Sequence, residues 1–69
     1  MRLYQFHFFS ARGVTPMMDL GLHEDDDQAR DAAAFLLGEH RSAAGVEIYD
    51  VDRLVARLDQ QVDARVARA

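Results

Sequence analysis

The sequence predicts a small α+β protein, in which one helix packs against an antiparallel sheet in the order strand, strand, helix, strand, strand. Two segments with alternating large apolar and polar residues open the chain, an alanine-rich segment follows, and two more alternating segments come after it. Gly13, Pro16 and Gly45 lie between these segments, as is typical of connections. Because the chain has 69 residues, it forms one domain at most, and its core is small for its surface.

The first strand is predicted over residues 3–9. Tyr4, Phe6 and Phe8 fall on one side of it, which indicates an aromatic inner face. Residues 10–16 form a loop, and a second strand follows, antiparallel to the first. A loop centred on Gly13 predicts the pairs Phe8 with Met18, Phe6 with Leu20, Tyr4 with Leu22 and His7 with Asp19. In this register the large apolar side chains of both strands share the inner face, and a slip of one residue would destroy that match.

The helix is predicted to run from about Asp26 to about Ala44. Acidic residues occupy its start, where the helix dipole favours them, and Asp25 or Asp26 is the expected N-cap. Gly45 stands where a left-handed C-terminal cap is expected. The stripe that faces the sheet is mostly alanine, so the helix can lie close to the aromatic rings; it consists of Ala29, Ala32, Ala33, Leu36, Leu37, His40, Ala43 and Ala44.

Residues 46–50 and 54–58 are predicted to form a second hairpin with a three-residue turn at 51–53. This register sets Glu47 opposite Arg57 and Tyr49 opposite Val55 on the outer face. A continuous helix is the alternative, because Val55, Leu58, Val62, Val66 and Ala69 also form a helical stripe with Asp52 as a cap. The expected division is a single module over residues 1–58, and a tail or short helix over 59–69.

These segments resemble a family of short bacterial proteins that is classed as a domain of unknown function. The resemblance covers about residues 3–58. It lies in the opening Tyr4-x-Phe6-His7-Phe8, in the acidic lead into the alanine-rich helix at Asp25 to Asp31, and in Val46-Glu47-Ile48-Tyr49-Asp50 followed by Arg53-Leu54-Val55. In that pattern a glycine commonly stands at the hairpin tip, whereas Val51 stands here. The resemblance implies the hairpin and carries no established activity.

Composition disfavours several classes of partner. The formal net charge of −4 would be repelled by a phosphate backbone, so we expect no nucleic acid partner, and a nucleic-acid regulator ranks third among the functions considered. The chain has no cysteine, hence no disulfide or thiolate metal site. No apolar run approaches the length of a membrane span or a signal peptide, so we expect no membrane partner and a cytoplasmic location. Its basic residues are all arginine, which favours a bacterial source.

Catalysis and metal binding have little support in the sequence. Its only serines and threonine, Ser10, Thr15 and Ser42, fall in predicted loops or at the helix end. His7 with Asp19 and His23 could serve a small metal- or ligand-responsive regulator, which is the second function considered. In the predicted register His23 lies too far along its strand from His7 to share a metal. We therefore expect no enzyme activity, no cofactor and no metal site.

The sheet face left uncovered by the helix is the most informative predicted surface. It is expected to show Leu3, Gln5, His7, Phe9, Asp19, Gly21, His23, Glu47, Tyr49, Val55 and Arg57. Phe35 projects away from the buried stripe of the helix. Aromatic, histidine and arginine side chains are typical interface anchors, so the predicted partner-binding residues are Phe9, His7, Tyr49, Val55, Arg57 and Phe35. The expected function is protein binding, including self-association into a homo-oligomer.

Overall fold

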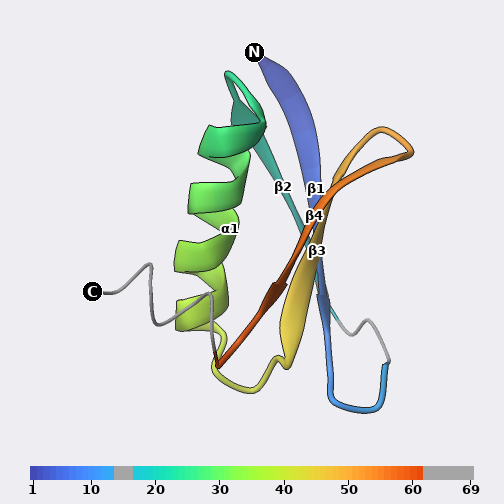
Figure 1. The fold of residues 1–69 in the computed structure, drawn as a ribbon, viewed down its shortest axis with the longest axis vertical. Helices are drawn as coiled ribbons and strands as arrows, with labels where there is room; N and C mark the ends of the chain where they lie inside the picture. The colour runs from blue at the N-terminus through green and yellow to red at the C-terminus, as the bar shows by residue number, and fades with distance from the viewer. Residues whose placement is uncertain (14–16, 62–69) are drawn as a thin grey trace.

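A computed structural model of the chain describes residues 1–13 and 17–61, and shows a four-stranded antiparallel sheet with one helix against one face (Figure 1). The elements are β1 (Arg2–Phe9), β2 (Met17–His23), α1 (Asp26–Glu39), β3 (Gly45–Asp50) and β4 (Arg53–Asp59). The strands lie in the order β2-β1-β3-β4, and neighbouring strands are antiparallel. The predicted α+β class and element order are therefore confirmed.

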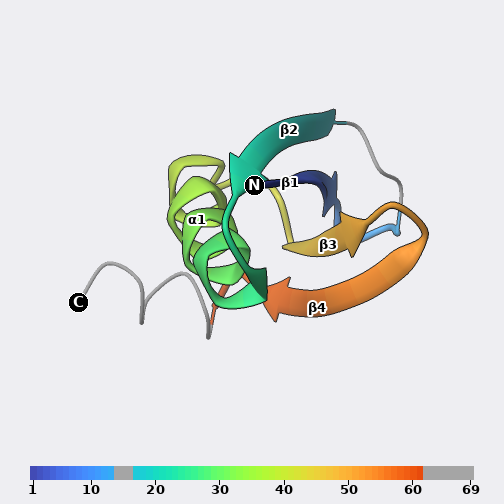
Figure 2. The same ribbon diagram turned by 90° about the horizontal axis from the view of Figure 1, so that it is seen from above.

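The core lies between the inner face of the sheet and α1, which Figure 2 shows on one side of the strands. Tyr4, Phe6 and Phe8 are at most 1% exposed, as the alternation in β1 predicts. Ala29 and Ala33 of α1 are fully buried against this layer, so small side chains on the helix oppose large ones on the sheet. The other buried apolar residues are Ala34, Leu37, Val46, Ile48 and Leu58.

The register of the first hairpin differs by one residue from the prediction. Tyr4 pairs with Gly21, Phe6 with Asp19, and His7 with Met18. Residues that pair directly lie on the same face of a sheet, so the side chains of Met18, Leu20 and Leu22 lie on the outer face. The prediction that they join the core, and the prediction that His7 lies opposite Asp19, are both wrong.

The observed register has a physical reason at Gly21. This residue lies opposite the large ring of Tyr4, and the space beside it holds the ring of His23, which lies 6.0 Å from Tyr4 and 5.8 Å from Phe6 between centroids. A Cβ at Gly21 would come within 2.9 Å of His23 Nε2. The imidazole thus covers the aromatic layer where the predicted register would have placed Leu22.

The helix begins as predicted and ends earlier. Asp25 is the N-cap, and its carboxylate accepts a 2.8 Å hydrogen bond from the Gln28 amide. At the other end the helix stops at Glu39 with His40 as the C-cap, so the predicted end at Ala44 and the predicted cap at Gly45 are wrong. The helix ends early because the following residues pair with the sheet. The Ala44 amide donates to the carbonyl of Phe9 at 2.8 Å, which aligns the residue before β3 with β1.

The side chain of Gln60 ties the helix end to the chain after β4. Its Nε2 lies 2.8 Å from the carbonyl oxygen of Leu37, 2.9 Å from that of His40 and 3.2 Å from that of Ala43. The Gln60 amide also donates to the Ala44 carbonyl at 2.9 Å. The Leu37 and His40 carbonyls also accept from the backbone amides of His40 and Ala43, so the Gln60 side chain adds to the hydrogen bonds that cap the helix end.

The second hairpin forms, and the alternative of a continuous helix through residues 53–59 is wrong. Glu47 lies opposite Arg57 as predicted, but the turn has two residues, Val51 and Asp52, instead of three. Asp50 pairs with Arg53, and a bulge follows, so that Leu54 and not Val55 lies opposite Tyr49.

Val51 at the hairpin tip has a φ of 61°, the left-handed region that favours glycine. Val51 thus adopts the backbone conformation for which a glycine at the hairpin tip would be suited. A tail or short helix was predicted over residues 59–69; Asp59 instead ends β4, and residues 62–69 lie outside the described residues. Within the part that the structure describes, α1 falls short of the length and hydropathy of a membrane-crossing helix.

Candidate functional site

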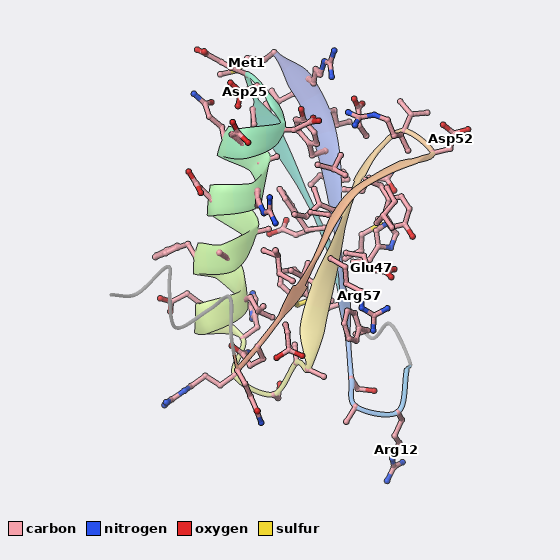
Figure 3. All side chains as sticks on the ribbon, in the orientation of Figure 1. Met1, Arg12, Asp25, Glu47, Asp52 and Arg57 are labelled. Carbon is pink, nitrogen blue, oxygen red and sulfur yellow. The ribbon has the colours of Figure 1, made fainter. Side chains whose placement is uncertain are left out.

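The sheet face opposite α1 is the candidate site. None of the other described elements packs over it, and Figure 3 shows the labelled side chains of Glu47 and Arg57 on the side of the sheet away from the helix. We call this surface the open face. Two groups of side chains occupy it, one apolar and one with linked polar and aromatic members.

The apolar group lies on β1 and β2 and consists of Leu3, Met18, Leu20 and Leu22, which we call the apolar strip. Leu3 pairs with Leu22, and Leu20 and Met18 follow along the same face of β2. These four side chains are 52 to 59% exposed. Scattered apolar residues are normal on a surface, but four adjacent ones on one face of a small protein indicate a contact surface.

The second group runs across β1, β3 and β4 and comprises Gln5, His7, Tyr49, Glu47, Arg57 and Phe9, which we call the central row. The Oε1 atom of Gln5 lies 3.0 Å from Nε2 of His7, whose ring meets that of Tyr49 edge to face at 5.1 Å. The Tyr49 hydroxyl donates to Glu47 at 3.2 Å. Burial and the neighbouring Glu47 carboxylate raise the pKa of the Tyr49 phenol. The polar atoms of the row thus bond to one another.

Arg57 completes the central row at its other end. Its Nη1 atom donates to Oε2 of Glu47 at 3.2 Å, and its guanidinium carbon lies 4.3 Å from the centre of the Phe9 ring. The Phe9 ring in turn lies over Gly45, where a Cβ would collide with it. The cation is therefore held between a carboxylate and an aromatic face, which fixes a long side chain at the surface.

A shallow hollow of about 340 Å³ opens on this face near the tip of the second hairpin. It is lined by Gln5, His7, Glu47, Tyr49, Val51 and Asp52. The polar groups of Gln5, His7, Tyr49 and Glu47 are already engaged with one another.

Four of the six predicted partner-binding residues come together. His7, Phe9, Tyr49 and Arg57 form most of the central row, whereas Val55 does not join them, because the bulge places it partly buried against the core.

Phe35 lies on α1 and is 55% exposed. Because α1 packs on the inner face of the sheet, as Figure 2 shows for the helix, its residue Phe35 is not part of the open face.

The sequence predicts only Leu3 of the apolar strip on the open face. It predicts Met18, Leu20 and Leu22 in the core, and it predicts Val55 opposite Tyr49, where the structure has Leu54, which is 50% exposed. Conversely Asp19, Gly21 and His23 were placed on the open face and lie on the inner one. The signal that could have placed them is Gly21, because a glycine suits a position opposite a buried ring.

A second polar cluster lies at the helix start. The Arg53 guanidinium donates to both carboxylate oxygens of Asp26, and the Tyr4 hydroxyl donates to Oδ1 at 2.8 Å. These hydrogen bonds, first from Arg53 and then from Tyr4, hold the pKa of Asp26 below its usual value. Burial, followed by Asp26, raises the pKa of Tyr4. Arg53 and Arg2 both reach Asp50 as well, at 3.0 and 3.1 Å, so this network joins α1 to three strands.

The three histidines lie apart in the fold. His7 is on the open face, His23 packs on the inner aromatic layer, and His40 caps α1 with its ring 5.0 Å from that of Phe8. The set of His7, Asp19 and His23 is thus divided between the two faces of the sheet. Among residues 1–13 and 17–61, no group of three or more histidine, aspartate or glutamate side chains could hold a metal ion.

Comparison with known proteins returns no match to a family model, to a curated protein or to a solved structure.

Proposed function

We propose that this protein is a small protein-binding module that acts through its open face, without catalysis, and that its partners include a second copy of itself. The single observation that carries this proposal is the apolar strip, four half-exposed side chains side by side on one face of the sheet. The proposed setting is the cytoplasm of a bacterium, as expected from the composition.

The free energy available at the strip supports the proposal. Complete burial of a leucine or methionine side chain contributes roughly 1.5–3 kcal/mol, so each strip residue, half exposed at present, can still contribute about 1 kcal/mol. Two strips in contact would contribute about 8 kcal/mol, which lies within the roughly 4–15 kcal/mol that association costs. Binding through the strip alone is therefore expected to be weak, and contacts outside the strip have to add to it.

The central row supports binding in a different way. An interface has an apolar centre and a polar rim. The row carries Tyr49 and Arg57, residue types enriched at interface hot spots, and both are already held in place by Glu47. Side chains fixed before binding lose less conformational entropy when a partner arrives.

An affinity purification with matched variants tests this function. Tagged wild type, Leu20→Asp and Phe35→Asp serve as baits in an extract of the native cells, and bound proteins, including the untagged chain itself, are quantified by mass spectrometry. Leu20 and Phe35 are 53% and 55% exposed, and Phe35 is not part of the open face. Partners should be retained by wild type and Phe35→Asp and released by Leu20→Asp. The same set of proteins on all three baits would refute binding through the open face.

A further inference from the structure

The strip and the central row differ in what they need from a partner. The polar atoms of the row are bonded to one another, so the row stays satisfied in contact with water. The apolar side chains of the strip cannot be stabilised in this way, because the free energy cost of exposing them to water falls only when another surface covers them. The centre of an interface on the open face therefore falls on β2 and β1, and the central row becomes part of its rim.

Charge indicates what kind of surface can cover the strip. The chain carries a net charge of −4, yet the strip consists of three leucines and a methionine. Its neighbours on β1, Gln5 and His7, are bonded to each other. The helix, which begins with Asp26 and Asp27, lies on the opposite face. Two copies that meet through their strips thus keep both acidic helix starts on the outside of the pair.

From these relationships, and resting on the function proposed above, we propose that a second copy of this chain covers the strip face to face, about a two-fold axis that passes near Leu20. Leu20 is the middle of the three exposed apolar residues of β2. A two-fold contact is self-complementary, so the strip of each copy meets the strip of the other. The product has four layers, helix, sheet, sheet and helix, with both open faces inside.

Pairing of the two β2 edges is the competing arrangement, and the structure disfavours it. The Leu20 amide already donates to the carboxylate of Asp19 at 2.9 Å, a hydrogen bond that pairing with a neighbouring strand would have to displace. An edge-to-edge dimer would also leave Leu20 and Leu22 in water on the outer face of a wider sheet. Of these two dimer arrangements, only contact between the open faces buries the strip.

Sedimentation equilibrium of the full chain, from micromolar to millimolar concentration, gives the first test. Wild type should dimerise, Leu20→Asp should weaken dimerisation by at least about 30-fold, the effect of losing one hot-spot residue, and Phe35→Asp should match wild type. Circular dichroism checks that both variants fold. A dimer that persists unchanged in Leu20→Asp, as an edge-to-edge dimer would, overturns the proposal, and so does a strictly monomeric wild type.

Disulfide trapping gives a second test that does not depend on a disruptive charge. The chain contains no cysteine, so a single introduced cysteine reports one position. Leu20→Cys should form a covalent dimer under mild oxidation, because the axis brings the two copies of this position together. Phe35→Cys, about as exposed at 55%, should remain mostly monomeric. Equal trapping of both variants would mean random collision and would overturn the two-fold arrangement.

These results separate the dimer from the wider function. If wild type is monomeric and Leu20→Cys is not trapped, but captured partners are still released by Leu20→Asp, the open face binds a different protein and only the dimer is refuted. If the captured proteins are also independent of Leu20, binding through the open face is refuted as well.

Discussion

The guanidinium of Arg53 donates hydrogen bonds to both carboxylate oxygens of Asp26, at 3.1 and 3.0 Å. Arg53 opens β4 and Asp26 is the first residue of α1, so this pair joins the edge of the sheet to the start of the helix. A planar guanidinium matches a carboxylate in this two-bond geometry, which adds orientation as well as attraction. The Tyr4 hydroxyl donates to the same carboxylate from the core.

This pair predicts how stability depends on pH. Because Arg53 and Tyr4 stabilise the ionised carboxylate, the pKa of Asp26 lies below its usual value of 3.8 in the folded protein. Its contribution to stability is therefore complete above about pH 5, declines as the pH falls below about 4, and is lost once the pH passes the lowered folded pKa. Wild type should melt above Asp26→Asn at neutral pH, and the two melting temperatures should converge as the pH falls through the lowered folded pKa of Asp26.

The adjacent Asp27 provides the control for that experiment. It lies in the same helical turn and is exposed, and it makes none of the contacts of Asp26 with Arg53 and Tyr4. Thermal melts of Asp27→Asn, followed by circular dichroism at the same pH values, should stay closer to wild type throughout. A gap between wild type and Asp26→Asn that is constant from neutral to acid pH would contradict the assigned role.

Several features of the fold could be predicted because local patterns specify them. The alternation of residues in β1 places Tyr4, Phe6 and Phe8 on the inner face in either register of β2. The N-cap at Asp25 depends only on a short acidic residue before a helical segment. The facing charges of Glu47 and Arg57 indicated the register of the second hairpin around its middle. Each of these depends on a few neighbouring residues.

The first hairpin could not be predicted in the same way, and the open face was misplaced with it. Its loop, residues 10–16, allows more than one register, and Met18, Leu20 and Leu22 alternate equally well in either. The choice depends on a nonlocal fit, in which Gly21 lies opposite Tyr4 and His23 covers the rings. A slip of one residue reverses every side chain of a strand, so the sequence predicts Met18, Leu20 and Leu22 in the core, and of the apolar strip only Leu3 on the open face.

A β-carbon at Gly45 should destabilise the fold. The backbone here lies so close to its neighbours that an added Cβ would collide with the carbonyl oxygen of Leu58 and the ring of Phe9. Overpacking of this kind costs roughly 1–3 kcal/mol, so Gly45→Ala should lower the free energy of unfolding by about 2 kcal/mol in a urea titration. Gly13→Asn is the control, because nothing lies within 4 Å of a Cβ there and asparagine tolerates its φ of 83°. An equal loss in both variants would argue against the close contact.

Replacement of Val51 by glycine should stabilise the second hairpin. A left-handed conformation costs an ordinary residue roughly 1–2 kcal/mol, and Val51 adopts a φ of 61° while its side chain is 77% exposed. Glycine removes that strain but loses more backbone entropy, so the expected net gain is about 0.5–1 kcal/mol in the free energy of unfolding. Asp52→Gly, at the neighbouring position of the turn with no left-handed φ, should give no such gain. A Val51→Gly protein less stable than wild type would refute this interpretation.

The side chain of Gln60 should contribute more to stability than its position after the last strand suggests. Its Nε2 donates to carbonyls of the helix end and of the following segment, at Leu37, His40 and Ala43. The Leu37 and His40 carbonyls also accept from the backbone amides of His40 and Ala43, so removal of the side chain costs the added hydrogen bonds, roughly 0.5–1.5 kcal/mol each. Gln60→Ala should therefore lower the free energy of unfolding by about 2 kcal/mol and speed hydrogen exchange in the last turn of α1.

Gln61→Ala is the matched control, since Gln61 is exposed and its backbone amide, not its side chain, bonds to Asp59. It should change the stability by less than about 0.5 kcal/mol, as surface substitutions usually do. Comparison of the two variants separates a role in the helix cap from a general effect of shortening a glutamine near the chain end. If both lose the same stability, or if exchange in the last turn of α1 is unaffected by Gln60→Ala, then the carbonyls at the helix end do not depend on this side chain.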